Sequence, residues 1–362
     1  MTVLARGAVR TGTRTAEWVL LDGPRVLRTG TGPAPAADEV VDGAHVVPGF
    51  VDVHCHGGGG VSFGGSVEDA LTVAATHRAH GTTTIVASLV TRPVDELART
   101  LDAYADLVAD GVLAGIHLEG PWLSPDHRGA HDASLLRAPE AGDLDRLLRP
   151  GLVAMVTVAP ELEGGLAAVQ RIAAAGAVAA IGHTDADADL TRRAVDAGAT
   201  WATHLFNAMP PVHHRAPGPV AALLEDERVT VELIADGVHL HPLVLSLAAH
   251  RAGRGRVAFV TDAMAATGSA DGRYRLGDLD VDVVDGVARL AGGGSIAGST
   301  LTLDRALAFA VAAGLDLDDA LAALTAVPAR ALGRPDVGHL EPGARGGAVV
   351  LADDLTVVRV LT

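Results

Sequence analysis

The chain has 362 residues, of which 49% are hydrophobic, and its formal net charge is −16. This length suits a barrel of eight strands and eight helices together with a small additional domain. The negative charge argues against nucleic acid as a partner, because nucleic-acid binding needs a basic face. No apolar segment follows Met1 and no run of about 18 apolar residues occurs, so we expect neither secretion nor a membrane span.

Two residue types narrow the chemistry further. Cys55 is the single cysteine, which excludes an internal disulfide and fits a reducing cytoplasm. The 28 basic residues are all arginine. Without lysine, the chain can neither form a Schiff base nor bridge metals through a carboxylated lysine. An acidic residue must therefore supply any oxygen ligand that a metal site needs.

The two ends of the chain have the same pattern. Residues 1–47 alternate short apolar runs with glycine, proline and aspartate, which is typical of short strands and turns. Residues 346–361 repeat this pattern. We expect the ends, residues 1–47 and 336–362, to form one small β-sandwich beside a barrel domain that spans residues 48–335.

Between the ends, strand-like and helix-like segments alternate, which predicts an α/β fold of the (β/α)8, TIM-like barrel type. The eight expected strands are residues 46–55, 82–90, 113–119, 152–160, 178–183, 200–207, 229–234 and 257–262. The clearest expected helices are residues 67–80, 94–109, 166–175 and 190–197. A hairpin-like insertion at residues 272–291, with a turn at Asp285-Gly286, follows the eighth strand. A further helix is expected to begin near Ser299 or Thr300, either of which can cap it.

The first barrel strand ends in the sequence V-H-C-H-G, with histidines at positions 54 and 56. Side chains alternate between the two faces of a strand, so His54 and His56 point the same way. Two imidazoles that face one point are typical of a metal site.

Other expected strands end in polar residues that can face the same point. Glu119 ends the strand in H-L-E-G-P, and His183 and His204 end two later, adjacent strands. A glutamate at the inner rim of a barrel is costly unless it is paired or bound to a metal. The three residues therefore predict a metal site of two imidazoles and one carboxylate that leaves a position open for water.

Asp262 ends the eighth strand in V-T-D-A. In a purely structural role, Asp262 would be a turn or cap residue. Its functional interpretation is a carboxylate that takes a proton from an attacking water and passes it to a leaving group. His131 lies on the loop after the third strand, where most histidines are simply solvated, and His77 belongs to a set of histidines that we expect to be exposed. No G-x-S-x-G motif or cysteine pair occurs, which removes the usual serine and cysteine hydrolases.

Taken together, these motifs resemble a known family. P-G-F-V-D-V-H-C-H-G, H-L-E-G-P-W-L, G-A-H, I-G-H-T, T-H-L-F-N-A-M, A-D-G-V-H, V-T-D-A and A-G-S-T-L-T-L occur in this order over almost the whole chain. This series resembles the N-acetylglucosamine-6-phosphate deacetylases of the amidohydrolase superfamily. The resemblance implies a (β/α)8 barrel with a β-sandwich built from both chain ends.

The resemblance also implies roles for individual residues. Glu119, His183 and His204 match the ligands of the principal divalent ion. His54 and His56 match a pair that some members use for a second ion and others lack. Asp262 matches the general base and acid, and His131 matches the residue that orients or polarises the acetamide carbonyl. Positions around the sugar phosphate are matched by Asn207, Ala208, Arg215 and His239.

The implied activity is metal-dependent hydrolysis of N-acetylglucosamine 6-phosphate to glucosamine 6-phosphate and acetate. Zn²⁺ is the expected ion, with Fe²⁺ or another divalent ion as alternatives and one or two ions per subunit. Family members take some phosphate contacts from the neighbouring subunit, so the resemblance implies a homodimer. Two alternatives stay open: an amidohydrolase of the same architecture for another N-acetylhexosamine 6-phosphate or N-acyl substrate, and a catalytically inactive barrel scaffold.

Overall fold

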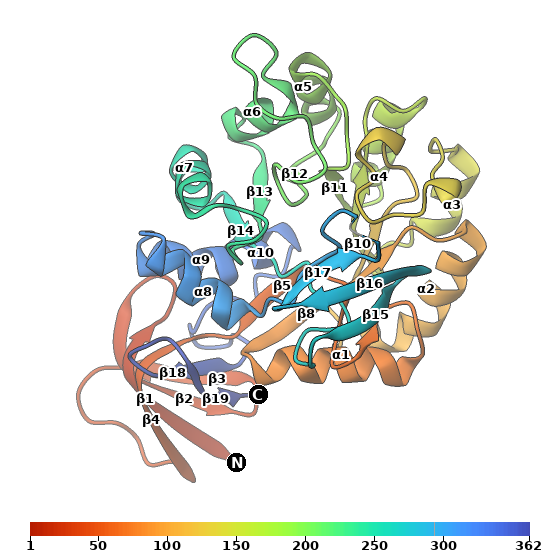
Figure 1. The fold of residues 1–362 in the computed structure, drawn as a ribbon. Coiled ribbons are helices and arrows are strands. Elements are labelled where there is room, and N and C mark those ends of the chain that lie inside the picture. The colour runs from red at the N-terminus through yellow and green to blue at the C-terminus, as the bar shows by residue number, and fades with distance from the viewer. Residues whose placement is uncertain (293) are drawn as a thin grey trace.

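The computed structural model describes residues 1–292 and 294–362 (Figure 1). Eight parallel strands form one sheet in the order β14-β13-β12-β11-β10-β9-β8-β5. The backbone N–H of Asp262 donates to the His54 carbonyl at 2.8 Å, and that of His56 donates to the Ala263 carbonyl at 2.8 Å. These bonds join the first strand to the segment after the last one and close the barrel. The strands are β5 (Phe50–Cys55), β8 (Thr82–Val90), β9 (Ile116–Glu119), β10 (Val153–Val158), β11 (Val178–Ile181), β12 (Trp201–Ala202), β13 (Thr230–Leu233) and β14 (Val257–Phe259).

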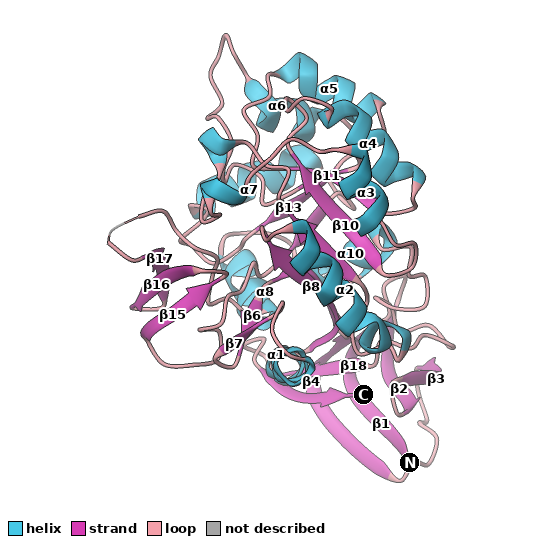
Figure 2. Ribbon diagram, turned by 90° about the vertical axis from the view of Figure 1, so that its right-hand side faces the viewer, coloured by secondary structure: helices cyan, strands magenta, loops and turns pink. Residues whose placement is uncertain are grey.

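Helices cover the outside of the barrel, and Figure 2 shows α2 to α5 along one side of the strands. In α2, Leu97, Leu101 and Tyr104 recur at helical spacing and are buried, while Asp95 and Glu96 favour the helix N-terminus. The helices are α1 (Val67–Ala79), α2 (Val94–Ala109), α3 (Ala141–Leu147), α4 (Gly165–Ala174), α5 (Ala188–Asp196), α6 (Gly218–Glu225), α7 (Pro242–Ala252), α8 (Leu303–Ala312), α9 (Leu317–Leu324) and α10 (Ala326–Ala331). None of the helices in the described residues is long and apolar enough to cross a membrane.

The two ends of the chain meet in a second sheet, in the order β19-β18-β4-β1-β2-β3. The C-terminal strand β18 pairs antiparallel with β4, so the prediction that the ends associate is confirmed. Val9, Val19, Val46 and Val350 from four of these strands pack in one buried cluster. The strands are β1 (Thr2–Arg10), β2 (Thr15–Asp22), β3 (Arg25–Gly30), β4 (Glu39–Pro48), β18 (Ala348–Leu351) and β19 (Val357–Leu361).

The predicted insertion after the last barrel strand is present as a three-stranded sheet. Its strands are β15 (Gly272–Leu276), β16 (Leu279–Val284) and β17 (Val287–Leu290). Asp285 and Gly286 turn between the last two strands with φ of 52° and 73°, as expected for a tight hairpin. The glycines after His56 form a smaller hairpin of β6 (Gly57–Gly58) and β7 (Val61–Ser62), and two 3₁₀ turns, Pro125–His127 and Ala133–Leu135, lie on the loop after β9.

Several predicted element boundaries were wrong. The expected eighth strand, for example, ends at Phe259 rather than at residue 262, and three further cases follow. The segment 46–55 is two strands, because β4 belongs to the terminal sheet and β5 to the barrel. The segment 200–207 is a strand only at Trp201–Ala202, because the backbone turns into the left-handed region at His204. The helix expected near Ser299 starts at Leu303 with Thr302 as its N-cap residue, and the Ser299 hydroxyl instead donates to the Thr261 carbonyl.

Candidate active site

Three buried side chains from β5 and β9 meet at the carboxyl ends of these strands. The Nε2 atoms of His54 and His56 lie 3.1 Å apart, as strand alternation predicts. Glu119 places one carboxylate oxygen 3.0 Å from His56 Nε2 and the other 3.4 Å from His54 Nε2. We call His54, His56 and Glu119 the first half-site.

Two further imidazoles approach Glu119 from the opposite side. His183 follows β11 and His204 follows β12, and their Nε2 atoms lie 3.0 Å apart. The same oxygen of Glu119, Oε1, lies 3.2 Å from His183 Nε2 and 3.1 Å from His204 Nε2. We call Glu119, His183 and His204 the second half-site. Each half-site has three potential ligand atoms close enough to hold one ion, and the Glu119 carboxylate is common to both.

The backbone is unusual where the second half-site and Asp262 are built. His183, His204 and Asp262 have φ of 47°, 25° and 48°, a region that residues other than glycine seldom occupy. Each lies two or three residues beyond the end of a short barrel strand, where the chain leaves the strand direction. Strained backbone of this kind costs free energy and is concentrated at functional sites.

In three of the four imidazoles, a hydrogen bond at Nδ1 fixes the orientation of the ring. His54 Nδ1 lies 3.1 Å from a carboxylate oxygen of Glu232. His56 Nδ1 and His183 Nδ1 donate to the carbonyls of Ser88 and His127, at 3.1 Å and 2.8 Å. With the proton on Nδ1, each ring presents the lone pair of Nε2 to the centre, which is the form that binds a metal.

The electrostatics of the pocket also fit a cation. Burial alone would raise the pKa of Glu119, but the imidazoles, His54 first among them, hold it well below its ordinary value. Burial lowers the pKa of His183 to about 4, so this ring is neutral and its lone pair is free. Although burial opposes it, hydrogen bonds and charges from Asp262 and Glu119 raise the pKa of His56 to about 9. The carboxylates thus favour positive charge at this point, and a divalent ion that displaces the His56 proton would supply the same charge.

Asp262 and His131 lie at the edge of this cluster. Asp262 Oδ1 is 3.3 Å from His56 Nε2, and the nearby His54 charge is the main influence that lowers the Asp262 pKa despite burial. The backbone N–H of Thr91 donates to His131 Nδ1 at 3.3 Å, so the proton of a neutral His131 ring is on Nε2. His131 Nε2 lies 3.4 Å from Glu119 Oε2 and therefore carries an N–H into the site.

The cluster opens into a cavity of about 370 Å³. Asn207, Ala208 and His239 line it together with side chains of both half-sites, so these three predicted residues are brought to the site. Asp236 holds His239 through a 2.7 Å contact with Nδ1, which turns Nε2 of that ring outward from the pair. Leu276 and Ile296, from the insertion and the segment after it, complete the rim.

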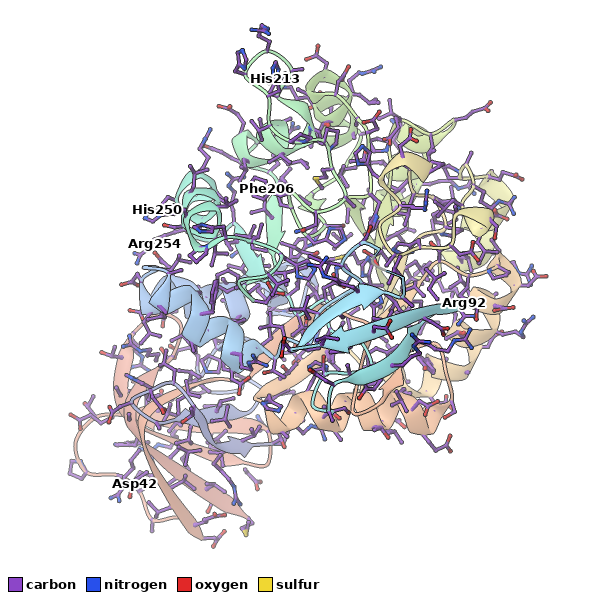
Figure 3. The ribbon with its side chains drawn as sticks, in the orientation of Figure 1. Asp42, Arg92, Phe206, His213, His250 and Arg254 are labelled. Atoms are coloured by element: carbon purple, nitrogen blue, oxygen red, sulfur yellow. The ribbon has the colours of Figure 1, made fainter. Side chains whose placement is uncertain are left out.

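Arg215 is the predicted site residue that the structure does not bring into this cavity. It lies on the exposed loop between β12 and α6, and its guanidinium contacts His214 Nε2 at 2.7 Å. Figure 3 shows His213 at the outer tip of this loop, whereas Phe206 lies nearer the barrel. The loop therefore points away from this pocket.

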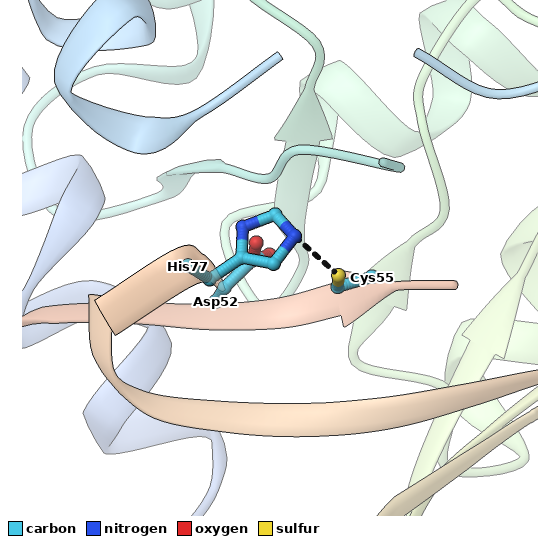
Figure 4. A group of neighbouring side chains, drawn as sticks. All are labelled: Asp52, Cys55 and His77. Carbon is cyan, nitrogen blue, oxygen red and sulfur yellow. Dashed lines mark hydrogen bonds between the residues drawn. The ribbon is translucent and has the colours of Figure 1, made fainter. Parts of the chain in front are cut away.

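Asp52, Cys55 and His77 form a third group of potential metal ligands (Figure 4). His77 was expected to be exposed and is fully buried, so that prediction was wrong. Its Nε2 lies 3.3 Å from Cys55 Sγ but donates to the Gly57 carbonyl at 2.9 Å. Burial and the Asp52 charge raise the pKa of the Cys55 thiol well above its ordinary value, so the thiolate that a metal needs is disfavoured. We therefore assign this group a structural role beneath the turn that follows His56.

The sequence reasoning missed two buried polar residues beside the half-sites. Glu232 in β13 contacts His54, and His117 in β9 hydrogen-bonds with the hydroxyls of Ser88 and Thr157 at 3.0 Å and 2.8 Å. Their position in the sequence could have indicated a specific role. Both lie inside short strands of a parallel barrel, where both faces are buried, and a charged or aromatic polar residue there needs a specific partner.

Comparison with known proteins agrees with this geometry. Residues 45–361 match the model of the amidohydrolase family. The chain belongs to the amidohydrolase family. It is 39% identical over 334 residues to an N-acetylglucosamine-6-phosphate deacetylase of Danio rerio, covering 86% of this chain and 81% of that one. It is 37% identical over 337 residues to an N-acetylgalactosamine-6-phosphate deacetylase of Escherichia coli O157:H7, covering 91% and 89%.

Solved structures of this family share the whole fold. An aspartate-to-alanine variant of the Mycobacterium smegmatis N-acetyl-D-glucosamine-6-phosphate deacetylase, in complex with N-acetyl-D-glucosamine-6-phosphate, superposes with a TM-score of 0.94. It is 50% identical, with 99% of this chain and 97% of that chain covered. The N-acetylglucosamine-6-phosphate deacetylase of Thermotoga maritima superposes with a TM-score of 0.91 at 28% identity, with 100% and 98% covered. The predicted barrel and terminal sheet are thus confirmed.

Proposed function

We propose that this amidohydrolase removes the N-acetyl group of N-acetylglucosamine 6-phosphate and releases glucosamine 6-phosphate and acetate. The observation that carries the proposal is the position of Glu119 between two imidazole pairs, with Asp262 and His131 at the mouth of the same cavity. The complex of the 50% identical Mycobacterium smegmatis protein with this sugar phosphate supports the choice of substrate.

Glu119, His183 and His204 would hold the principal divalent ion, and His54 and His56 would hold a second ion with the same carboxylate. Imidazole and carboxylate ligands suit Zn²⁺, with Fe²⁺ as the alternative. When bound, such an ion supplies Lewis acidity that activates water and polarises the acetyl carbonyl.

The protein residues then provide the proton transfers. Asp262 has a pKa below its ordinary value, so it is ionised and can accept the proton of the attacking water. The same carboxyl group gives this proton to the departing amine. His131 carries its proton on Nε2 and can donate a hydrogen bond to the oxygen that becomes negative during the attack. Acid–base transfer and oxyanion stabilisation are thus assigned to different residues.

The phosphate of the substrate would be bound at the outer part of the cavity. His239, Asn207 and Ala208 line the cavity and would contact the phosphate from the same subunit. We propose that Arg215, whose loop points outward, serves the cavity of a second subunit in a homodimer, because a guanidinium fork matches phosphate oxygens. The single buried thiol of Cys55 suits a reducing compartment, and we place the reaction in the cytoplasm. We also propose that residues 1–47 with 336–362 form a small β-sandwich domain and residues 48–335 the catalytic one.

A substrate panel tests this proposal. We expect acetate release from N-acetylglucosamine 6-phosphate to exceed release from unphosphorylated N-acetylglucosamine by a factor of roughly 30 or more, the value of a buried charge-assisted contact. N-acetylgalactosamine 6-phosphate is the second candidate, because the Escherichia coli relative is named for it. A higher kcat/KM on that sugar would replace our choice of substrate. No acetate from any member of the panel would favour the inactive scaffold.

A further inference from the structure

Glu232 lies in the wall of the barrel and does not line the cavity. It is the third residue of β13 and is fully buried. Its Oε1 accepts the indole N–H of Trp201 at 2.5 Å. Its Oε2 accepts the backbone N–H of His204 at 2.9 Å and lies 3.1 Å from His54 Nδ1. One carboxylate therefore joins a ligand of the first half-site to the backbone turn that carries a ligand of the second.

The chemistry of these partners determines which atoms hold protons. The indole N–H and the backbone N–H can only donate, so both oxygens of Glu232 act as acceptors. His54 then completes the set with a proton on Nδ1, which leaves the lone pair on Nε2. That lone pair faces His56 Nε2 at 3.1 Å and Glu119 Oε1 at 3.4 Å. If the proton were on Nε2 instead, His54 would have no lone pair facing the first half-site.

We propose that Glu232 is a positioning residue that commits His54 to bind a divalent ion in the first half-site through Nε2. The inference rests on the metal ligands of the proposed function and extends it. Glu232 fixes the tautomer of His54 and, through the His204 backbone, ties the first half-site to the second. Loss of a carboxylate behind a metal-bound imidazole typically costs about 10- to 100-fold in metal affinity.

Three variants, Glu232→Gln, Trp201→Phe and the double variant, test the role of Glu232 by changing which groups donate and which accept hydrogen bonds. In Glu232→Gln the amide has one accepting and one donating end, but all three partners donate. The NH2 group of the amide must therefore face either the indole N–H of Trp201 or the N–H groups of His204 and His54, so that two donors meet without an acceptor. Trp201→Phe alone removes one donor and leaves the contacts to His54 and His204 intact. In the double variant the glutamine oxygen can face His54 and His204 without opposing Trp201.

The readout is zinc affinity and stoichiometry, measured by equilibrium dialysis and metal analysis. We expect two ions per chain in the wild type and in Trp201→Phe. Glu232→Gln should weaken one of the two ions by about 10- to 100-fold, and the double variant should regain part of that affinity. Two ions bound with wild-type affinity in Glu232→Gln would overturn the proposal. A double variant weaker than Glu232→Gln would overturn it also, because it would indicate a packing role.

A measurement on the wild type covers the case in which the variants fail to fold. Nitrogen-15 spectra of histidine in the zinc-loaded protein should find a proton on His54 Nδ1 and none on Nε2. A proton on His54 Nε2 would overturn the proposal. Zinc binding and acetate release also separate the two proposals. One ion with full deacetylase activity contradicts only the role of Glu232, whereas absence of any bound ion contradicts the proposed function as well.

Discussion

The two half-sites share Glu119 but are built in different ways. The first takes His54 and His56 from alternate positions at the end of β5, and hydrogen bonds to Glu232 and Ser88 orient their rings. The second takes His183 and His204 from residues beyond two strands, where left-handed backbone directs the side chains. Both half-sites use hydrogen-bond partners, including the His127 carbonyl for His183, but the second depends in addition on the turns that leave the barrel.

Glu119→Gln is expected to have the largest effect, because it removes the ligand that both half-sites share. An amide cannot supply the negative charge or serve two ions as a carboxylate does. We expect both ions to be lost and kcat/KM to fall by roughly 1000-fold or more, which corresponds to several kcal/mol of transition-state stabilisation. Metal analysis alongside acetate release checks this. Retention of one full equivalent of zinc would mean that the half-sites do not depend on a common carboxylate.

His183→Ala and His54→Ala compare the half-sites directly. His183→Ala should lose the principal ion and lower kcat/KM nearly as far as Glu119→Gln, whereas His54→Ala should cost about 10-fold if the second ion is auxiliary. Zinc stoichiometry should fall by one ion in each variant. Equal loss of activity in the two variants would show that both ions take part in the reaction equally.

Asp262→Asn separates proton transfer from metal binding. Asparagine keeps the shape of the side chain but cannot accept a proton, so kcat should fall by roughly 100-fold or more. The zinc content and KM should stay near those of the wild type. A variant that keeps its kcat would assign Asp262 to structure and the activation of water to another group.

Arg215→Ala tests a residue outside both half-sites. We expect kcat/KM for N-acetylglucosamine 6-phosphate to fall by roughly 30-fold or more, with little change for the unphosphorylated sugar. Mixed dimers of Arg215→Ala with His183→Ala subunits test whether the loop serves a neighbour. Recovered activity in the mixture would support a shared site, and equal loss on both sugars would assign Arg215 to structure.

The same contrast explains what the sequence could predict. The second barrel strand (82–90) and the helix after it (94–109) were predicted with their observed bounds, because periodicity is a local property. The shared direction of His54 and His56 follows from strand alternation alone. The turns at His204, Phe206 and Ala208 carry no such signal, because left-handed backbone at these residue types arises from the surrounding fold. Glu232 was missed for a similar reason: its three partners come from β5 and from the region of β12, and only the closed barrel brings them together.

Substitution of His77, which lies beneath the first half-site, is expected to have the smallest effect, a change in the pH dependence of stability. Its Nε2 donates to the carbonyl of Gly57, directly after His56, and burial lowers its pKa from 6.5 to about 4. Between these two values the unfolded chain binds a proton that the folded protein does not, so stability should fall as the pH falls. Between about pH 7 and about pH 5, this group lowers the free energy of unfolding of the wild type by about 2 kcal/mol.

In His77→Gln, the loss of unfolding free energy between these pH values should be smaller by that amount, as measured by urea unfolding of the zinc-loaded proteins. His80→Gln is the matched control at the end of the same helix, because the hydrogen bond that His80 donates to Asp304 raises the pKa of His80. The stability that His80 contributes is present at low pH and is lost as the pH rises, so its removal should change the pH dependence in the opposite direction. Parallel curves for His77→Gln and the wild type would show that the buried ring does not make the folded protein acid-sensitive.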